Sequence, residues 1–75
     1  MAYRRFPPPW VVIENRESFV IEDATGQPLA HLYFEDESIR RGILRRLTKD
    51  EARRIALGIA RLPSLIGRAQ HRKLE

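Results

Sequence analysis

Cysteine is absent from the 75 residues of this chain, and histidine occurs only twice. Without cysteine the chain can form no disulfide bond, no thiolate zinc site and no cysteine nucleophile. The two histidines, His31 and His71, stand forty positions apart, and no carboxylate pattern near either has a recognised metal-ligand spacing. We therefore expect no metal site.

Glycine and serine motifs that hold phosphate or attack a substrate are also missing. Phosphate-binding loops need several glycines within a few residues, but the glycines here are scattered at positions 26, 42, 58 and 67. None of the serines at positions 18, 38 and 64 lies in the sharp Gly-flanked turn that exposes a nucleophile in hydrolases. We therefore expect a protein that is not an enzyme and that uses no cofactor.

Long hydrophobic runs are lacking as well. The longest stretch without a polar residue near the N-terminus is Trp10–Ile13, and prolines precede it. A signal-peptide core needs at least about seven apolar residues and a membrane-spanning helix about 20. We expect a cytoplasmic protein with no membrane association.

The chain is short, but its composition is that of a folded protein. Its hydrophobic fraction of 43% is close to ordinary globular usage and argues against disorder. A domain of this size buries only about 60% of the surface of its unfolded chain, so its stability is marginal. Since disulfides are excluded, oligomerisation is the remaining common source of extra stability.

Arginine is abundant, and it is unevenly placed. Residues 1–37 carry three Arg against seven Asp or Glu, a net charge of −4. Residues 38–75 carry nine Arg and two Lys against three acidic residues, a net charge of +8. This split predicts one basic face on a domain whose first half is acidic. The arginines that could form such a face are Arg40, Arg41, Arg45, Arg46, Arg53, Arg54 and Arg61.

Three parts can be distinguished along the chain. Residues 1–9 form a proline-rich arm, because three consecutive prolines favour an extended polyproline II conformation. Residues 10–67 form a single small α+β domain, and residues 68–75 form a flexible basic tail. We interpret the arm as a stiff lead-in whose Phe6 and Trp10 pack on the core, rather than as a ligand for a proline-recognition domain.

Three strands are predicted at 10–14, 18–23 and 29–35, each rich in Val, Ile, Phe or Tyr and bounded by turn formers. Gly26 can take the left-handed conformation in the second turn. Pro28 at the start of the third strand suits an edge position, because proline has no amide to donate to a neighbouring strand. The expected fold class is therefore α+β: a three-stranded antiparallel β-meander followed by a short helix and a C-terminal amphipathic helix.

Both faces of the predicted sheet are apolar. The first collects Val11, Ile13, Val20, Ala30, Leu32 and Phe34, and the second collects Trp10, Val12, Glu14, Phe19, Ile21, Leu29, His31 and Tyr33. We expect the C-terminal helix to cover the first face through Ile55 and Ile59, because that face has fewer polar residues. The second face is then left exposed. Together with Leu57, which lies opposite the apolar stripe of the helix, it supplies the candidate interface: Trp10, Val12, Phe19, Ile21, Tyr33 and Leu57.

A helical period begins after the acidic turn at 35–37. Apolar residues at 39, 43, 44 and 47 predict a short helix, capped by Asp36 or Ser38, that lies beside the C-terminal helix. The acidic turn itself is typical of a solvated helix cap, although it could also seat a cation or a basic partner.

The C-terminal helix is predicted at 48–62. Thr48 and Glu51 form a capping box at its start. Its apolar stripe consists of Ala52, Ile55, Ala56, Ile59 and Leu62. We expect Pro63 to end the helix and residues 64–67 to fold back onto the core.

Four segments give the chain a resemblance to a known family. They read RFPPPW at 5–10, DATGQPLA at 23–30, YFEDE at 33–37 and LTKDEARRIA at 47–56. With them the chain resembles a family of small uncharacterised bacterial proteins, chiefly alphaproteobacterial, over most of residues 4–67. The resemblance implies a free-standing domain with a β-meander followed by helix. It implies no activity and no binding residue.

Two functions from different classes remain open. The first is a non-enzymatic interaction module that forms a homodimer or docks a protein partner through its uncovered apolar face. The alternative is a small basic protein that binds nucleic acid through the arginine face, whose guanidinium groups can hold phosphate in a bidentate manner. We rank the first above the second. Pairing of the arginines within the chain explains the charge split equally well, and no base-reading element is visible.

Overall fold

The computed structural model describes residues 6–68 and contains the predicted antiparallel meander. Strands β1 (Val11–Glu14), β2 (Ser18–Glu22) and β3 (Pro28–Tyr33) form one sheet in the order β1-β2-β3. The edge position expected for Pro28 is confirmed, since β3 lies at one side of the sheet. The α+β fold class predicted from the sequence is therefore confirmed.

The turn between β2 and β3 is built around one buried carboxylate. Asp23 Oδ1 accepts hydrogen bonds from the Thr25 hydroxyl and from the backbone amides of Thr25 and Gln27. Burial opposes ionisation of this carboxyl, but the hydrogen bonds outweigh it and hold the pKa of Asp23 below its usual value. Gly26 has a φ of 90°, the left-handed conformation predicted for this turn.

Three helices follow the sheet: α1 (Ser38–Leu44), α2 (Lys49–Ala60) and α3 (Leu62–Arg68). The chain bends at Arg61, and Pro63 lies in the first turn of α3, where its missing amide costs nothing. The predicted helix therefore ends at Ala60, shortly before Pro63, and residues 64–67 continue as a second helix in which Leu65 is 56% exposed. The predicted tail begins inside α3, since Arg68 ends that helix. Residues 69–75 of the tail and residues 1–5 of the predicted arm lie outside the described residues.

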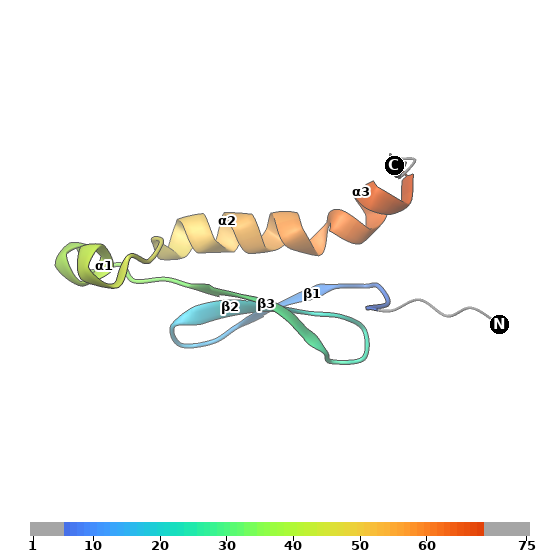
Figure 1. Cartoon of the computed structure of the whole chain (residues 1–75), viewed down its shortest axis with the longest axis horizontal. Helices are drawn as coiled ribbons and strands as arrows, with labels where there is room; N and C mark the ends of the chain where they lie inside the picture. The colour runs from blue at the N-terminus through green and yellow to red at the C-terminus, as the bar shows by residue number, and fades with distance from the viewer. Residues whose placement is uncertain (1–5, 69–75) are drawn as a thin grey trace, which may run out of the picture.

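Helix α2 covers one face of the sheet and forms a two-layer structure with it (Figure 1). At the centre of the core, Phe19 and Phe34 pack with their ring centroids 5.2 Å apart. Ala52 and Ala56 of α2 are fully buried against this cluster. Partly buried side chains complete the core: Trp10, Val12, Leu29, Ala30, Leu32, Leu47 and Ile59.

The covered face combines residues that we expected on opposite faces of the sheet. In the observed register Val12 pairs with Ile21 and Ile21 with Ala30, so these residues share the face beneath α2. The grouping of β1 with β2 is as predicted, but the face assigned to β3 relative to them was wrong, and so was the prediction that α2 covers Val11, Ile13 and Val20. Two polar residues had argued against covering this face. Glu14, at its edge, forms an ion pair with Lys49 at 2.9 Å, and His31 lies on the other face because it pairs with Val20.

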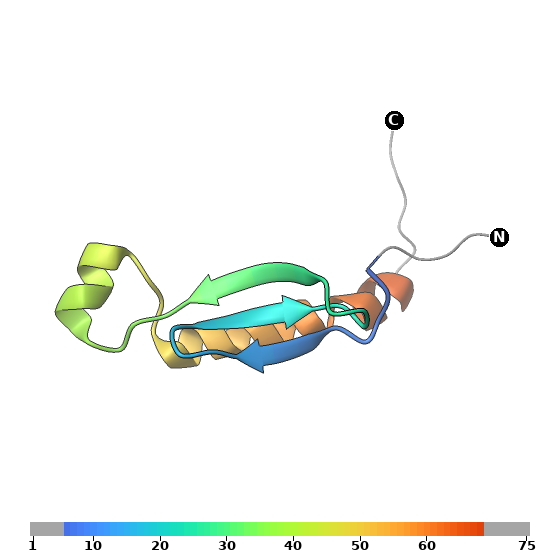
Figure 2. The same cartoon turned by 90° about the horizontal axis from the view of Figure 1, so that it is seen from below.

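The molecule is long and thin for its size. Its principal extents are 50 × 29 × 18 Å and its radius of gyration is 15.1 Å, whereas a compact chain of this length has about 11 Å. Helix α1 lies beyond one end of the sheet and accounts for much of this length (Figure 1). Figure 2 shows the three strands in front of α2, with no other element across them on that side.

Candidate interaction surfaces

Helix α1 is fixed only at its ends. The carboxylate of Glu37 caps its first turn by accepting hydrogen bonds from the amides of Ile39 and Arg40. Asp36 or Ser38 was predicted as this cap, but Asp36 instead accepts from the amide of Lys49 at the start of α2. The helix ends at Arg45, whose φ of 56° closes the last turn in the left-handed conformation.

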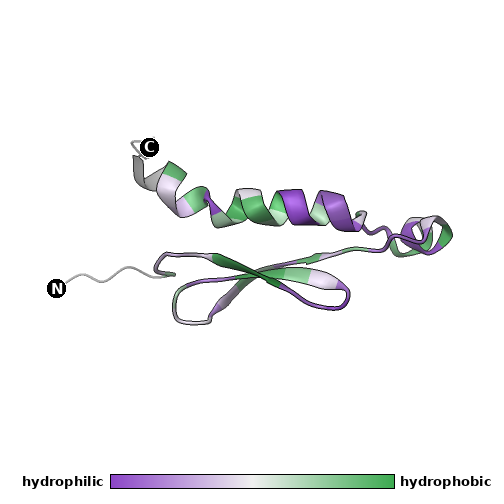
Figure 3. Cartoon of the chain, turned by 180° about the vertical axis from the view of Figure 1, so that it is seen from behind, coloured by the Kyte–Doolittle hydropathy of each residue, from purple (hydrophilic) through white to green (hydrophobic). Residues whose placement is uncertain are grey.

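No residue of α1 is buried. Ile39 and Ile43 are 70% and 74% exposed, and Leu44 is 42% exposed. Ile39 and Ile43 stand one turn apart and lie on the same side of the helix. Figure 3 shows α1 with apolar and polar positions side by side, well separated from the sheet and α2. Within residues 6–68, α1 packs against no other helix or strand. The prediction that this short helix lies beside the C-terminal helix was therefore wrong.

The face of the sheet that points away from α2 is a second apolar surface. Val11 and Ile13 of β1 and Tyr33 of β3 are exposed on it. Val20, in the central strand, is buried because Ile13 and His31 flank it on both sides. We call this surface the open sheet face and define it by Val11, Ile13, Val20, Glu22, His31 and Tyr33.

The candidate interface predicted from the sequence is not one surface. Phe19 and Ile21 are fully buried under α2, and Val12 and Trp10 are half-buried in the same core. Tyr33 is exposed, but it lies on the opposite face of the sheet from those four residues. Leu57 is exposed on α2, as predicted. Of the six predicted interface residues, only Tyr33 and Leu57 are therefore exposed to a partner. They lie on different elements and apart from the other four residues, which belong to the core.

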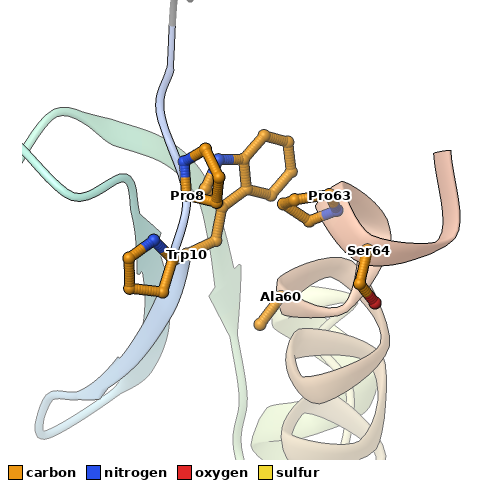
Figure 4. A pocket seen from close by; sticks show the side chains of 6 residues that line it. Pro8, Trp10, Ala60, Pro63 and Ser64 are labelled. Atoms are coloured by element: carbon orange, nitrogen blue, oxygen red, sulfur yellow. The ribbon is translucent and has the colours of Figure 1, made fainter. Parts of the chain in front are cut away.

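Trp10 lines an apolar pocket of about 380 Å³ at the end of the molecule opposite α1 (Figure 4). Its indole N–H donates to the carbonyl of Phe6 at 2.8 Å, so the pocket presents no unsatisfied donor from this ring. The arm is held there by a hydrogen bond from the amide of Ala24 to the carbonyl of Pro7. The pocket lies between this arm and the junction of α2 and α3, and its lining consists of Pro8, Pro9, Trp10, Ala60, Pro63 and Ser64.

Most of the predicted arginine face is paired within the chain. Arg53 and Arg54 both bind Asp50, at 3.3 and 2.9 Å. Arg46 forms an ion pair with Glu17 at 3.2 Å, and its guanidinium also lies 5.1 Å from the ring centre of Tyr33.

The arginines of α1 behave similarly. Arg40 lies 3.8 Å from the carboxylate of Glu35, and Arg41 donates to the backbone carbonyls of Glu35 and Asp36. Of the seven candidate arginines, only Arg45 and Arg61 have side chains without a hydrogen bond or ion pair to another described residue. The seven therefore do not form one free cationic surface.

Within the described residues, neither His31 nor the acidic turn forms a metal site, and His71 lies outside them. His31 stacks on Tyr33 on the open sheet face, with ring centroids 6.2 Å apart. Glu37 and Asp36 are used as caps for backbone amides, as noted above, and Glu35 accepts from the amide of Glu37. Among residues 6–68, no three acidic or histidine side chains gather closely enough to hold a metal ion.

Ile39 and Ile43, the most exposed of the large apolar residues that the structure describes, were not among the candidates predicted from sequence. Their spacing predicted a helix, and arginines flank them on both sides. These arginines could have indicated that the two isoleucines are exposed, because a short helix with cations beside its apolar residues has no wide apolar face to pack on a core.

Comparison with known proteins adds no assignment. No family model matches the chain, and no curated protein or solved structure shows significant similarity to it. The family resemblance drawn from the sequence segments therefore stays a prediction. In the part of the chain that the structure describes, no helix is long and apolar enough to cross a membrane.

Proposed function

We propose that this protein is a non-enzymatic interaction module that associates with a second copy of itself. The observation that carries the proposal is α1, which exposes Ile39, Ile43 and Leu44 and packs against no other element. Isolated helices shorter than about 12 residues are unstable in water, because few hydrogen bonds offset the cost of nucleation. A seven-residue helix therefore requires packing from outside the chain.

The overall shape supports self-association. The radius of gyration exceeds that of a compact domain, and the sheet and α2 form only two layers, so one face of the sheet stays open. A chain of this length without disulfides gains stability most readily by burying such surfaces against a partner. A second copy offers apolar surface of the same size and chemistry, so no further component is needed.

Nucleic-acid binding through the arginine face is the weaker alternative. Four of its seven arginines lie in ion pairs with carboxylates, and Arg41 is bound to backbone carbonyls. A ligand phosphate has to displace these partners, so the +8 half of the chain carries fewer free cations than its composition suggests. The cytoplasmic location expected from the sequence remains a prediction alongside this function.

Sedimentation velocity at tens of micromolar tests the proposal. We expect the wild-type protein, 8.8 kDa per chain, to sediment as a dimer. Ile43→Glu places a charge among the exposed apolar residues of α1, which are Ile39, Ile43 and Leu44 and which we call the strip on α1. It should raise the Kd of the dimer by at least about tenfold, as loss of a central interface contact does. Leu57→Glu is the matched control, because Leu57 is also an exposed aliphatic residue but lies on α2.

Ile43→Glu should leave folding unchanged, because Ile43 is 74% exposed and touches no core residue. Circular dichroism melts of both variants in the monomer range check this point. A wild-type chain that stays monomeric at these concentrations contradicts the proposal. So does a dimer that Leu57→Glu weakens and Ile43→Glu does not.

A further inference from the structure

The second copy has two unpartnered apolar surfaces to cover, and they lie on different parts of the chain. One is the strip on α1, and the other is the open sheet face. Strands of four to six residues, spaced about 4.8 Å apart, give this face a footprint of roughly 200 Å². A stable interface buries about 800 Å² on each partner. Neither the open sheet face nor the seven-residue α1 reaches that area, so the interface has to use both and also take in the polar residues around them.

We infer that two copies pack with their open sheet faces together and in opposite directions, so that α1 of each copy docks at the far end of the partner's sheet. This inference rests on the proposed self-association and specifies its geometry. In Figure 2, α1 lies beyond the end at which β1 and β3 finish. Val11, which begins β1, and Glu22, which ends β2, are paired at the opposite end. A two-fold axis that lies between the two sheets and perpendicular to the long axis places the α1 end of each copy at the end of the partner that carries Val11 and Glu22.

The charges at these two places are complementary. Glu22 lies on the open sheet face beside Val11 and forms no ion pair with any described residue. Arg45 directly follows α1 and its exposed Leu44, and its side chain likewise has no partner in the described chain. Glu22 is the carboxylate of the sheet that has no cap, turn or ion-pair role, and Arg45 is an unpaired cation at the C-terminal end of α1. Docking of α1 on the partner's sheet pairs the two, once in each direction.

Charge reversal gives a direct test of this pairing. The proposed dimer contains two contacts between position 45 of one copy and position 22 of the other. In the Arg45→Glu homodimer two glutamates face each other at each contact, and in the Glu22→Arg homodimer two arginines do. Each single variant should therefore raise the Kd of its homodimer by about tenfold, since attraction is replaced by repulsion at two exposed contacts. An equimolar mixture of the two variants forms heterodimers in which both contacts are again attractive. We expect the mixture, and the homodimer of the double variant R45E/E22R, to return to within about threefold of the wild-type Kd.

Sedimentation equilibrium at low and high salt measures these constants. The differences between variants should shrink in high salt, because exposed charges are screened. Arg61→Glu is the control, since Arg61 is also exposed and without a side-chain partner among the described residues, but it lies at the end of α2 and not on the open sheet face.

Disulfide trapping tests the same geometry independently, and the absence of cysteine leaves no background. Val11→Cys and Ile43→Cys lie at opposite ends of one copy, so neither variant alone should form a covalent dimer. Their mixture should, because a disulfide forms when the two Cα atoms come within about 7 Å. Val11→Cys mixed with Leu57→Cys serves as the control and should not be trapped.

The outcomes separate this inference from the proposed function. A monomeric wild-type protein overturns both. A wild-type dimer whose R45E and E22R mixture stays weak, or in which Ile43→Cys is trapped with itself, overturns the antiparallel docking alone and indicates pairing of α1 with α1. Trapping of Leu57→Cys with Val11→Cys also overturns it.

Discussion

At the scale of single residues, two alanines decide which face of the sheet becomes the core. Ala52 and Ala56 let the backbone of α2 approach the sheet closely, and the large side chains come from the strands as Phe19, Ile21 and Phe34. The sequence pattern placed Ile55 at the centre of this contact, but Ile55 is 44% exposed. A helix that packs on aromatic residues is held best by small ones at the closest approach, because the interior must be filled at crystal-like density.

Two isoleucine truncations should therefore differ sharply in their effect on stability. Ile21→Ala removes a fully buried side chain and should lower the free energy of unfolding by about 2–4 kcal/mol. Ile55→Ala removes a half-exposed one and should cost less than about 1 kcal/mol. Urea denaturation monitored by circular dichroism measures both. Equal losses would show that Ile55 is packed in the core after all, as its position in the periodic stripe of α2 suggested.

At the scale of elements, α2 shows what local sequence can determine. Thr48 accepts a hydrogen bond from the amide of Glu51, and the Glu51 carboxylate accepts from the amide of Thr48, so the predicted capping box is confirmed. The signal is reliable because donor and acceptor lie three residues apart in the chain. The hydrogen bonds from the Thr48 amide and hydroxyl lower the pKa of Glu51 from its ordinary value, against a smaller opposing effect of burial.

The same logic explains which parts of the fold could not be predicted. The strands, the left-handed Gly26 and the capping box depend on neighbouring residues, and they were predicted correctly. The face of each strand depends on its register and on a partner far along the chain. A slip of one residue reverses the face, and an irregularity between Ile21 and Glu22 shifts the pairing of β2 with β3. The location of α1 depends on the segments that join it to β3 and α2. The hydrophobic periodicity of a helix predicts its existence but not its position in the fold.

Glu51→Gln should change the pH dependence of stability in a defined direction. Gln can still accept the amide hydrogen bond but does not titrate. Because folding lowers the pKa of Glu51, its contribution to stability is present above the unfolded value, near 4.5, and is lost as the pH falls through the lower folded value. The wild-type protein should therefore be more stable than Glu51→Gln at pH 7, and the difference should shrink as the pH falls below 4.5 and disappear below the lower folded pKa.

Thermal melts across this range measure the difference directly. Titration of Asp23, whose pKa is also lowered, affects both proteins equally and cancels in the comparison. A gap between the two proteins that stays constant with pH would show that the charge of Glu51 does not contribute.

At the scale of the whole molecule, the chain divides into a packed body and one unpacked helix. The body consists of the sheet and α2, whose core holds every buried apolar residue among those described except Val20. Helix α1 has backbone hydrogen bonds and caps but no packing. Stability therefore cannot be uniform along the chain, because local opening depends on the tertiary contacts that a segment makes. The candidate site and the least stable element are the same segment.

Hydrogen exchange should make this coupling visible as a dependence on protein concentration. In the monomer, the amides of α1 should exchange almost as fast as those of an unfolded peptide, because seven residues alone do not sustain a helix. As dimers form, binding supplies the missing packing, and protection of residues 41–44 should rise along with the fraction of dimer. The amides of β2, at the centre of the sheet, provide the internal reference and should stay protected at every concentration.

Ile43→Glu should abolish the concentration-dependent protection of α1 and leave β2 unchanged. Strong protection of α1 in dilute wild-type protein would mean that the helix is stable without a partner, which removes the physical reason for self-association.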